Sequence, residues 1–224
     1  MCTVSWRPAG DGSGYDLFFN RDESRRRPPA IPPDIHQGRG NGRYLAASDP
    51  QAGGTWLATT DAAETFGLLN LYPPGAPPGT PYDPPEPRSR GLLVADLAAG
   101  ALALPNISPA SYRPFLLVHL SLPCAARLWR WDGTALRTVP IRQPVSTSSY
   151  AQDEALAFRR ALFHRLPQPL FHHHHDPHNT KLSPRMERGD AATVSITHLQ
   201  IRPGSIRSAY FTPPDFNTPR LAQL

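Results

Sequence analysis

Residues 1–23 read MCTVSWRPAGDGSGYDLFFNRDE and set the architecture of the first half of the chain. Residues 3–7 and 15–20 are two short runs with the composition of β-strands. The segment Asp11-Gly12-Ser13-Gly14 lies between them and has the residues of a tight turn, so the sequence predicts a β-hairpin. Since the hairpin begins at the second residue, we expect the N-terminus to be built into a sheet rather than frayed.

Cys2, at the start of this hairpin, is a candidate nucleophile. Removal of Met1 is expected when the second residue is small, and we expect the mature chain to begin at Cys2. One residue would then hold a thiol and an α-amine whose pKa is about 7.7 to 8.0. Such an amine can take the thiol proton and return it to a leaving group, as in N-terminal threonine nucleophiles. The alternative interpretation of Cys2 is an ordinary small buried residue.

The second strand ends in the charged segment Asn20-Arg21-Asp22-Glu23. In an antiparallel hairpin this end returns close to the start of the first strand, within side-chain reach of Cys2. Asp22 could hold the α-ammonium group in place, and Arg21 could favour the thiolate. A salt-bridged strand end that faces solvent is the alternative interpretation.

The rest of the chain is read as further hairpins with two inserted helices. Strands are predicted at 56–60, 66–72, 113–120, 126–131, 134–141, 192–201 and 206–211, and helices at 89–99 and 151–166. This order favours an α+β fold with antiparallel sheets over a doubly wound α/β fold. Residues 1–224 are predicted to form a single domain, with a proline-rich surface loop at 73–87 and a histidine-rich loop at 167–190.

Composition excludes several classes of protein. The net charge of +5 comes almost wholly from dispersed arginines, since Lys181 is the only lysine, and no stacking motif accompanies them. A nucleic-acid-binding protein is therefore not expected. The longest apolar stretch, 92–104, is shorter than the roughly 20 residues of a membrane helix. Two cysteines cannot form a disulfide framework, and no signal peptide is recognisable, so a cytoplasmic protein is expected.

The run of four histidines at 172–175 could in principle bind a transition metal. A specific site needs ligands that converge from separate elements, whereas this run lies between prolines without a Cys or Glu ligand pattern. We interpret it as a variable surface loop and expect no metal or cofactor. Cys124 follows a proline and is interpreted as a small buried residue.

Several segments together resemble one family, the NRDE or Transport and Golgi organisation 2 family. They are Met1-Cys2-Thr3, Asn20-Arg21-Asp22-Glu23, Gly53-Gly54-Thr55-Trp56-Leu57, Leu69-Asn70-Leu71-Tyr72 and Ser89-Arg90-Gly91. Looser similarity to bacterial members follows in Met186, Arg188, Asp190-Ala191 and Thr193-Val194-Ser195. The likeness is firmest over residues 1–100, and the combined set is much more specific than any single motif.

This family in turn resembles the N-terminal nucleophile (Ntn) hydrolases of the linear-amide acylase type. The resemblance implies a four-layer α-β-β-α sandwich with two central antiparallel sheets. It implies that Cys2 is the nucleophile, that Asp22 orients its amine, that Arg21 is a charged neighbour and that Asn70 lines an oxyanion site. The acylases supply a second oxyanion donor from an asparagine on a later strand end, where this chain has Thr147.

Two functions follow from the resemblance. The first is a cysteine amidohydrolase that cleaves a small linear amide through an acyl-enzyme on Cys2. The second is a non-catalytic binding protein that uses the same cleft for haem or an acyl or lipid ligand, because members of the family are linked to haem handling and acyl-CoA homeostasis. Haem would usually need an axial ligand, which His36, His119 or Cys2 could supply. The oligomeric state is not indicated by the sequence.

Overall fold

The opening hairpin consists of β1 (Cys2–Pro8) and β2 (Tyr15–Ser24) in the computed structural model, which describes residues 2–72 and 84–224. Cys2 pairs with Arg21, and the register runs on to Pro8 opposite Tyr15. The predicted hairpin is therefore confirmed, and the chain enters the sheet at Cys2. The second strand is longer than expected, because it continues to Ser24, so the charged segment lies within a strand rather than at its end.

Two antiparallel sheets make up the centre of the molecule. The six-stranded sheet has the order β10-β1-β2-β11-β12-β13, in which the additional strands are β10 (Val145–Thr147), β11 (Ala191–Arg202), β12 (Ser205–Phe211) and β13 (Arg220–Gln223). The seven-stranded sheet has the order β3-β4-β5-β6-β7-β8-β9, formed by β3 (Ile31–Gln37), β4 (Arg43–Ser48), β5 (Leu57–Thr60), β6 (Thr65–Asn70), β7 (Phe115–Ser121), β8 (Ala125–Trp131) and β9 (Leu136–Thr138).

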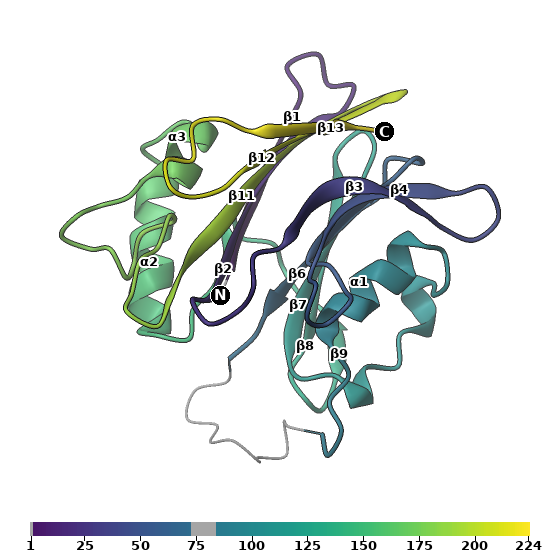
Figure 1. The fold of residues 1–224 in the computed structure, drawn as a ribbon, viewed down its shortest axis with the longest axis horizontal. Coiled ribbons are helices and arrows are strands. Elements are labelled where there is room, and N and C mark those ends of the chain that lie inside the picture. Colours follow the sequence, from purple (N-terminus) through teal and green to yellow (C-terminus); the bar gives the residue numbers. More distant parts are fainter. Residues whose placement is uncertain (1, 73–83) are drawn as a thin grey trace.

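Helices cover the outer faces of both sheets. They are α1 (Arg90–Ala98), α2 (Gln152–Phe163), α3 (Gln168–His173) and two single-turn 3₁₀ helices, η1 (Leu104–Asn106) and η2 (Pro109–Ser111). Figure 1 shows α2 and α3 against the six-stranded sheet and α1 against the seven-stranded sheet. The predicted α+β class and the four-layer α-β-β-α sandwich are confirmed.

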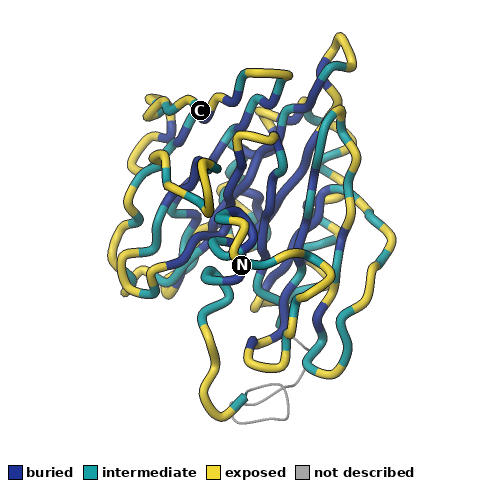
Figure 2. The backbone as a smooth tube through the Cα atoms, turned by 90° about the vertical axis from the view of Figure 1, so that its right-hand side faces the viewer, coloured by how far each residue is buried: buried dark blue, intermediate teal, exposed yellow. Residues whose placement is uncertain are grey.

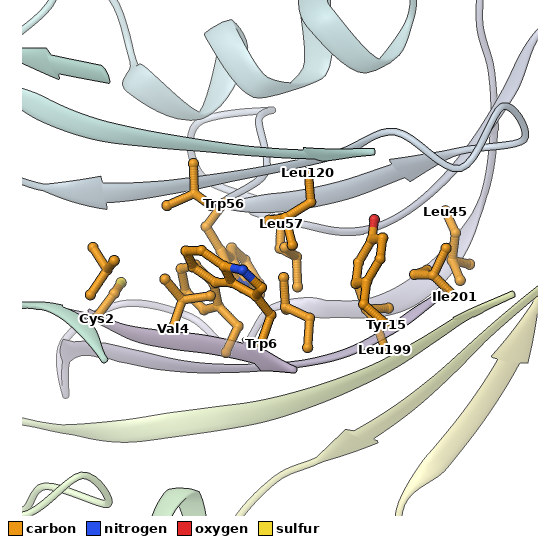
Figure 3. Close-up of a cluster of buried hydrophobic side chains, with 14 of the residues drawn as sticks. Cys2, Val4, Trp6, Tyr15, Leu45, Trp56, Leu57, Leu120, Leu199 and Ile201 are labelled. Carbon is orange, nitrogen blue, oxygen red and sulfur yellow. The ribbon is translucent and has the colours of Figure 1, made fainter. Parts of the chain in front are cut away.

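The main core lies between the two sheets. Alternate residues of β1, namely Cys2, Val4 and Trp6, point into it and meet Trp56 and Leu57 from the opposite sheet (Figure 3). A second core fills the space between the seven-stranded sheet and α1, where Leu93, Val94 and Leu97 are buried. Buried backbone accordingly follows the facing strands, and exposed backbone marks the connecting loops (Figure 2).

Strands β3, β4, β10 and β13 are not among the strands that the sequence predicts. The prolines between Asp22 and about Gly42 indicate a loop, and β3 lies in this segment. Strand β3 contains Pro32 and Pro33, which lack the N–H donor that a central strand needs. It lies at the edge of the seven-stranded sheet and pairs only with β4 among the described strands, with a register shift between Ile31 and Asp34. An edge strand tolerates the missing N–H donors, so the two prolines do not exclude a strand here.

Burial agrees with the sequence at most of the expected core positions. Trp56, Leu68, Val118 and Ile196 are buried, as predicted. Leu156 and Val194, also expected in the core, are only half-buried. Val194 falls within a β-bulge of β11, where the register shifts between Thr193 and Ser195, so the simple alternation of inward residues breaks there.

Two predictions from the sequence concern membrane and loop segments. None of the helices in the described part of the chain has the length and apolar composition of a membrane span. The proline-rich loop predicted at 73–87 lies largely outside the described residues, which resume at residue 84. Residues 84–87 adopt neither helix nor strand.

Candidate active site

Cys2 occupies the first position of β1, between two neighbouring strands. It pairs with Arg21 of β2 on one side and with Thr147 of β10 on the other. Directly paired residues of antiparallel strands project from the same face, so Arg21 and Thr147 flank the thiol on the face between the sheets. The Cys2 residue is 6% exposed.

Arg21 is held in a fixed position beside Cys2. Its guanidinium group stacks over the Trp56 ring at 4.2 Å and forms an ion pair with Glu23 at 3.1 Å. The Asp49 carboxylate lies 3.8 Å away. These contacts with the Trp56 ring and with two carboxylates hold the guanidinium in place, and it provides a permanent positive charge near the thiol.

Asp22 follows Arg21 and therefore projects from the opposite face of the strand, toward α2. The Thr193 hydroxyl donates a hydrogen bond of 2.6 Å to Asp22 Oδ1, and Arg159 Nη2 lies 3.7 Å from Asp22 Oδ2. The side chains of Asp22 and Arg159 are both fully buried. Burial raises the pKa of Asp22, while Arg159 and the Thr193 hydrogen bond act in the opposite direction.

Arg159 was missed in the sequence analysis, which assigned only apolar residues to the inner side of its helix. On α2 the buried residues are Ala155 and Arg159, four positions apart and hence on one face. Arg159 Nη1 donates to Thr3 Oγ1 at 2.8 Å, and Arg159 Nη2 donates to the Ser183 carbonyl at 3.0 Å. The guanidinium thus connects the start of β1 with Asp22 and with the segment before β11.

Asn20, the first residue of the charged segment, has a structural role. Its Nδ2 donates hydrogen bonds to the carbonyls of His172 at 2.8 Å and Pro184 at 2.9 Å. Burial holds the pKa of His172 well below its usual range, so the ring is neutral. The Nδ1–H group of His172 donates to Asn20 Oδ1 at 2.7 Å, and its Nε2 accepts from the Ser5 hydroxyl at 2.8 Å.

These contacts correct the interpretation of residues 167–190 as a histidine-rich surface loop. His172 is fully buried, and residues 168–173 form α3. No local pattern indicates this burial, because the partners of His172 come from β1 and β2, more than 150 residues away. Among the residues that the structure describes, no group of three or more His, Cys, Asp or Glu side chains is placed to hold a metal ion.

Two further motifs meet at the start of α1. Thr55 donates its backbone N–H to the Gly91 carbonyl at 3.1 Å, and Gly54 lies directly against Gly91. A Cβ atom on Gly54 would lie 2.3 Å from the carbonyl carbon of Gly91, so only glycine fits there. The segment that carries Trp56 and the segment that carries Arg90 are therefore fixed to each other through backbone contact.

Replacing Gly54 with alanine is expected to lower the free energy of unfolding by about 1–3 kcal/mol, the usual effect of overpacking. The added methyl group would clash with the backbone at Gly91, which is part of α1 and cannot shift without disturbing the helix. Urea unfolding measures the loss, and Gly189→Ala is the control, because a Cβ atom there meets nothing within 4 Å. Equal midpoints for the two variants would contradict the described contact.

A cavity of about 290 Å³ opens above Cys2. Its walls come from both sheets and from the start of α1, and they include Cys2, Arg21, Asp22, Trp56, Asn70 and Arg90. The structure thus brings four of the five predicted site residues together around one space. The fifth, Thr147, lies beside Cys2 on β10 instead of lining the cavity, and its hydroxyl has no hydrogen-bond partner among the described residues.

Burial raises the pKa of the Cys2 thiol from 9.0 to about 11. The Asp22 carboxylate contributes to this increase in pKa, while Arg21 and a hydrogen bond from the Asp22 backbone N–H oppose it. A thiol with this pKa is protonated at neutral pH, so attack on a carbonyl requires a nearby base.

The candidate haem ligands are dispersed. His36 Nε2 contacts the Ala46 carbonyl at 3.1 Å and its ring stacks on Tyr44, whereas His119 Nε2 contacts Glu64 at 3.3 Å. Of the three candidates, Cys2 lines the cavity described above and the two histidines do not.

Comparisons with known proteins were made by sequence and by structure. The sequence profile of the family described as Transport and Golgi organisation 2 matches residues 1–108. No curated protein matches the chain in sequence. Among solved structures, penicillin V acylase from Agrobacterium tumefaciens is similar with a TM-score of 0.54 and 12% identity, over 100% of this chain and 86% of that one.

A second similar structure is that of the C2A mutant of conjugated bile acid hydrolase from Clostridium perfringens. It has a TM-score of 0.52 and 8% identity, and the match covers 100% of this chain and 96% of that one. Identities this low show a shared fold and nothing finer. Residues 1–108 thus match the Transport and Golgi organisation 2 family, and the chain shares its fold with these two acylases.

Proposed function

We propose that this protein is an N-terminal-cysteine amidohydrolase that cleaves a small linear amide through an acyl-enzyme on Cys2. The observation that carries the proposal is the position of Cys2 at the start of β1, where Arg21, Asp22 and Asn70 line the same cavity. The two similar structures, a penicillin V acylase and a conjugated bile acid hydrolase, support hydrolysis of carbon–nitrogen bonds other than peptide bonds.

The proposed reaction begins with removal of Met1, which frees the α-amine of Cys2. The amine takes the thiol proton, and the sulfur attacks the amide carbonyl to form a tetrahedral intermediate. The α-ammonium group then gives its proton to the departing nitrogen, so that an amine leaves and a thioester remains on Cys2. Water, deprotonated by the same α-amine, hydrolyses the thioester and releases a carboxylic acid.

Each neighbouring group has a role in this scheme. Because the Cys2 pKa is raised to about 11, the α-amine is needed as a base. The buried Asp22 carboxylate stabilises the α-ammonium form, and Arg21 stabilises the thiolate during the transfer. Asn70 donates a hydrogen bond from its side-chain amide to the oxyanion of the tetrahedral intermediate. The second donor in this scheme is Thr147, which would have to turn from its position beside Cys2 into the cavity.

The test is a screen of simple linear amides for release of amine, combined with intact-mass measurement of the protein. An adduct of the acyl mass on the Cys2 peptide, on a chain that lacks Met1, is the expected result. A chain that keeps Met1 and hydrolyses no amide would overturn the proposal.

One observation favours a second candidate, a non-catalytic binding protein for haem or an acyl or lipid ligand. Thr147 does not line the cavity, and one absent oxyanion donor typically costs about 10² to 10³ in rate. Titration of haem and acyl-CoA separates the two candidates, since a carrier binds its ligand tightly without turnover, and acyl-CoA binding to a carrier is unaffected by Cys2→Ala.

Replacing Asn70 with alanine is expected to lower kcat by about 10²- to 10³-fold, because one oxyanion donor is lost. KM and the unfolding midpoint should change little, since Asn70 is half-buried at the end of β6. Steady-state kinetics on the best amide of the screen measures the effect. Asn106→Ala, on an exposed 3₁₀ turn, is the control, and an unchanged kcat for Asn70→Ala would remove it from the proposed oxyanion site.

A further inference from the structure

The cavity above Cys2 carries more positive than negative side chains. Its arginines are Arg21, Arg27, Arg88, Arg90 and Arg113. Its carboxylates are Asp22, Glu23 and Asp49. Guanidinium groups that gather in a partly enclosed space favour a bound anion.

Most of these arginines have carboxylate partners. Arg21 and Arg27 both pair with Glu23, and Arg27 also contacts Asp49 at 2.8 Å. Arg88 forms an ion pair with Asp96, in which the nitrogen and oxygen atoms lie 2.7 Å apart. Their charges are therefore already compensated within the protein.

Arg90 differs from these three. Its Nη1 donates a hydrogen bond of 2.8 Å to the Pro114 carbonyl, and no carboxylate of the described residues lies within ion-pair distance of it. Burial lowers the pKa of Arg90, which Tyr72 raises and Arg113 lowers. A half-buried cation that has no ion-pair partner among the described residues is stabilised by an anionic ligand, which supplies a counter-charge in place of water.

The position of Arg90 relative to Cys2 suits a ligand that reaches both. Arg90 is the first residue of α1, and the contact of Gly54 with Gly91 fixes this helix end against the opposite wall. The first turn of α1 contains no acidic residue, so the positive end of the helix adds to the charge of Arg90. Cys2 and Arg90 line the same cavity of about 290 Å³, the size of a small ligand.

We propose that Arg90 binds a carboxylate on the substrate, so that the amide cleaved at Cys2 carries a negative charge a few bonds from the scissile carbonyl. The planar guanidinium matches a carboxylate with two parallel hydrogen bonds. This inference rests on the proposed function, because the ligand is a substrate only if the protein hydrolyses amides. The binding of a small carboxylate beside Cys2 can be tested without any turnover.

The experiment uses two electrophiles of nearly equal size, iodoacetate and iodoacetamide, which differ in one negative charge. Both alkylate Cys2, and peptide mapping separates Cys2 from Cys124. We expect the ratio of the iodoacetate rate to the iodoacetamide rate at Cys2 to exceed that of N-acetylcysteine by about ten- to a hundred-fold, the effect of a charged hydrogen bond.

Arg90→Gln should bring this ratio close to that of N-acetylcysteine. Arg25→Gln is the matched control, because it removes the same charge at an exposed site outside the cavity and should leave the ratio unchanged. Equal ratios in wild type and Arg90→Gln would overturn the proposal, as would failure of both reagents to label Cys2 at pH 9. Amide hydrolysis without charge selectivity would overturn this inference alone, whereas selectivity without hydrolysis of any amide would support it and count against the proposed function.

Discussion

Replacing Cys2 with alanine is expected to lower amide turnover by about 10⁴-fold or more, because the attacking atom is lost. Cys2→Ser should retain a weak remnant. A serine hydroxyl can attack with help from the α-amine, but it is a poorer nucleophile than a thiol under the same base. Because Cys2 is buried at the start of β1, both variants should keep the two-sheet fold, with a modest loss of stability.

Steady-state kinetics and circular dichroism on the two variants check this expectation. The matched control is Cys124→Ala, which removes the other free thiol at a partly exposed position. Full activity in Cys2→Ala would exclude Cys2 as the nucleophile. Acyl-CoA binding that is tight and equal in wild type and Cys2→Ala, or tight haem binding to the wild type, would favour the carrier if no amide is hydrolysed.

Replacing Asp22 with asparagine is expected to lower the free energy of unfolding by about 3–5 kcal/mol, the typical effect of leaving one member of a buried ion pair alone. If Asp22 only orients the α-amine, as the sequence suggests, Asp22→Asn should lower the rate and leave the stability unchanged. The structure changes that expectation, because Arg159 lies 3.7 Å from Asp22 and both side chains are fully buried. An uncompensated guanidinium would remain under β1.

Urea unfolding of Asp22→Asn, Arg159→Met and the double variant measures the coupling of the pair. The double variant should be more stable than Asp22→Asn, because it removes the unpaired charge. Glu23→Gln is the control, since Glu23 is 22% exposed and its ion pairs should contribute less than about 1 kcal/mol. A free energy of unfolding for Asp22→Asn equal to that of wild type would show that the pair contributes nothing.

Some features of the site could be predicted from the sequence because they depend on residues close together in the chain. The pairing of Cys2 with Arg21 follows from a turn at 11–14 and the antiparallel register of two short strands. The α+β class follows in the same way from repeated hairpins. The roles of Cys2, Arg21, Asp22, Asn70 and Thr147 rest on the family resemblance and remain proposals.

Other features depend on partners that no local pattern identifies. Arg159 and His172 look like surface residues in the sequence, since Arg is rarely buried without a partner and a histidine run between prolines is typical of a loop. Both side chains are fully buried. Arg159 contacts Asp22 and Thr3, and His172 forms hydrogen bonds with Asn20 and Ser5. A charged or polar side chain can be buried only where its partners converge, and these partners lie on other strands.

By itself, therefore, the sequence determined the hairpins, the fold class and the adjacency of Cys2 and Arg21, because periodicity and turn residues act over short distances. Only the tertiary structure decided that Gly54 meets Gly91, that Arg159 lies beneath the start of β1, and that Arg90 faces the cavity of Cys2. These contacts join segments that are distant in the chain. Their stability depends on desolvation and charge compensation, which are defined once both sheets and their helices are packed together.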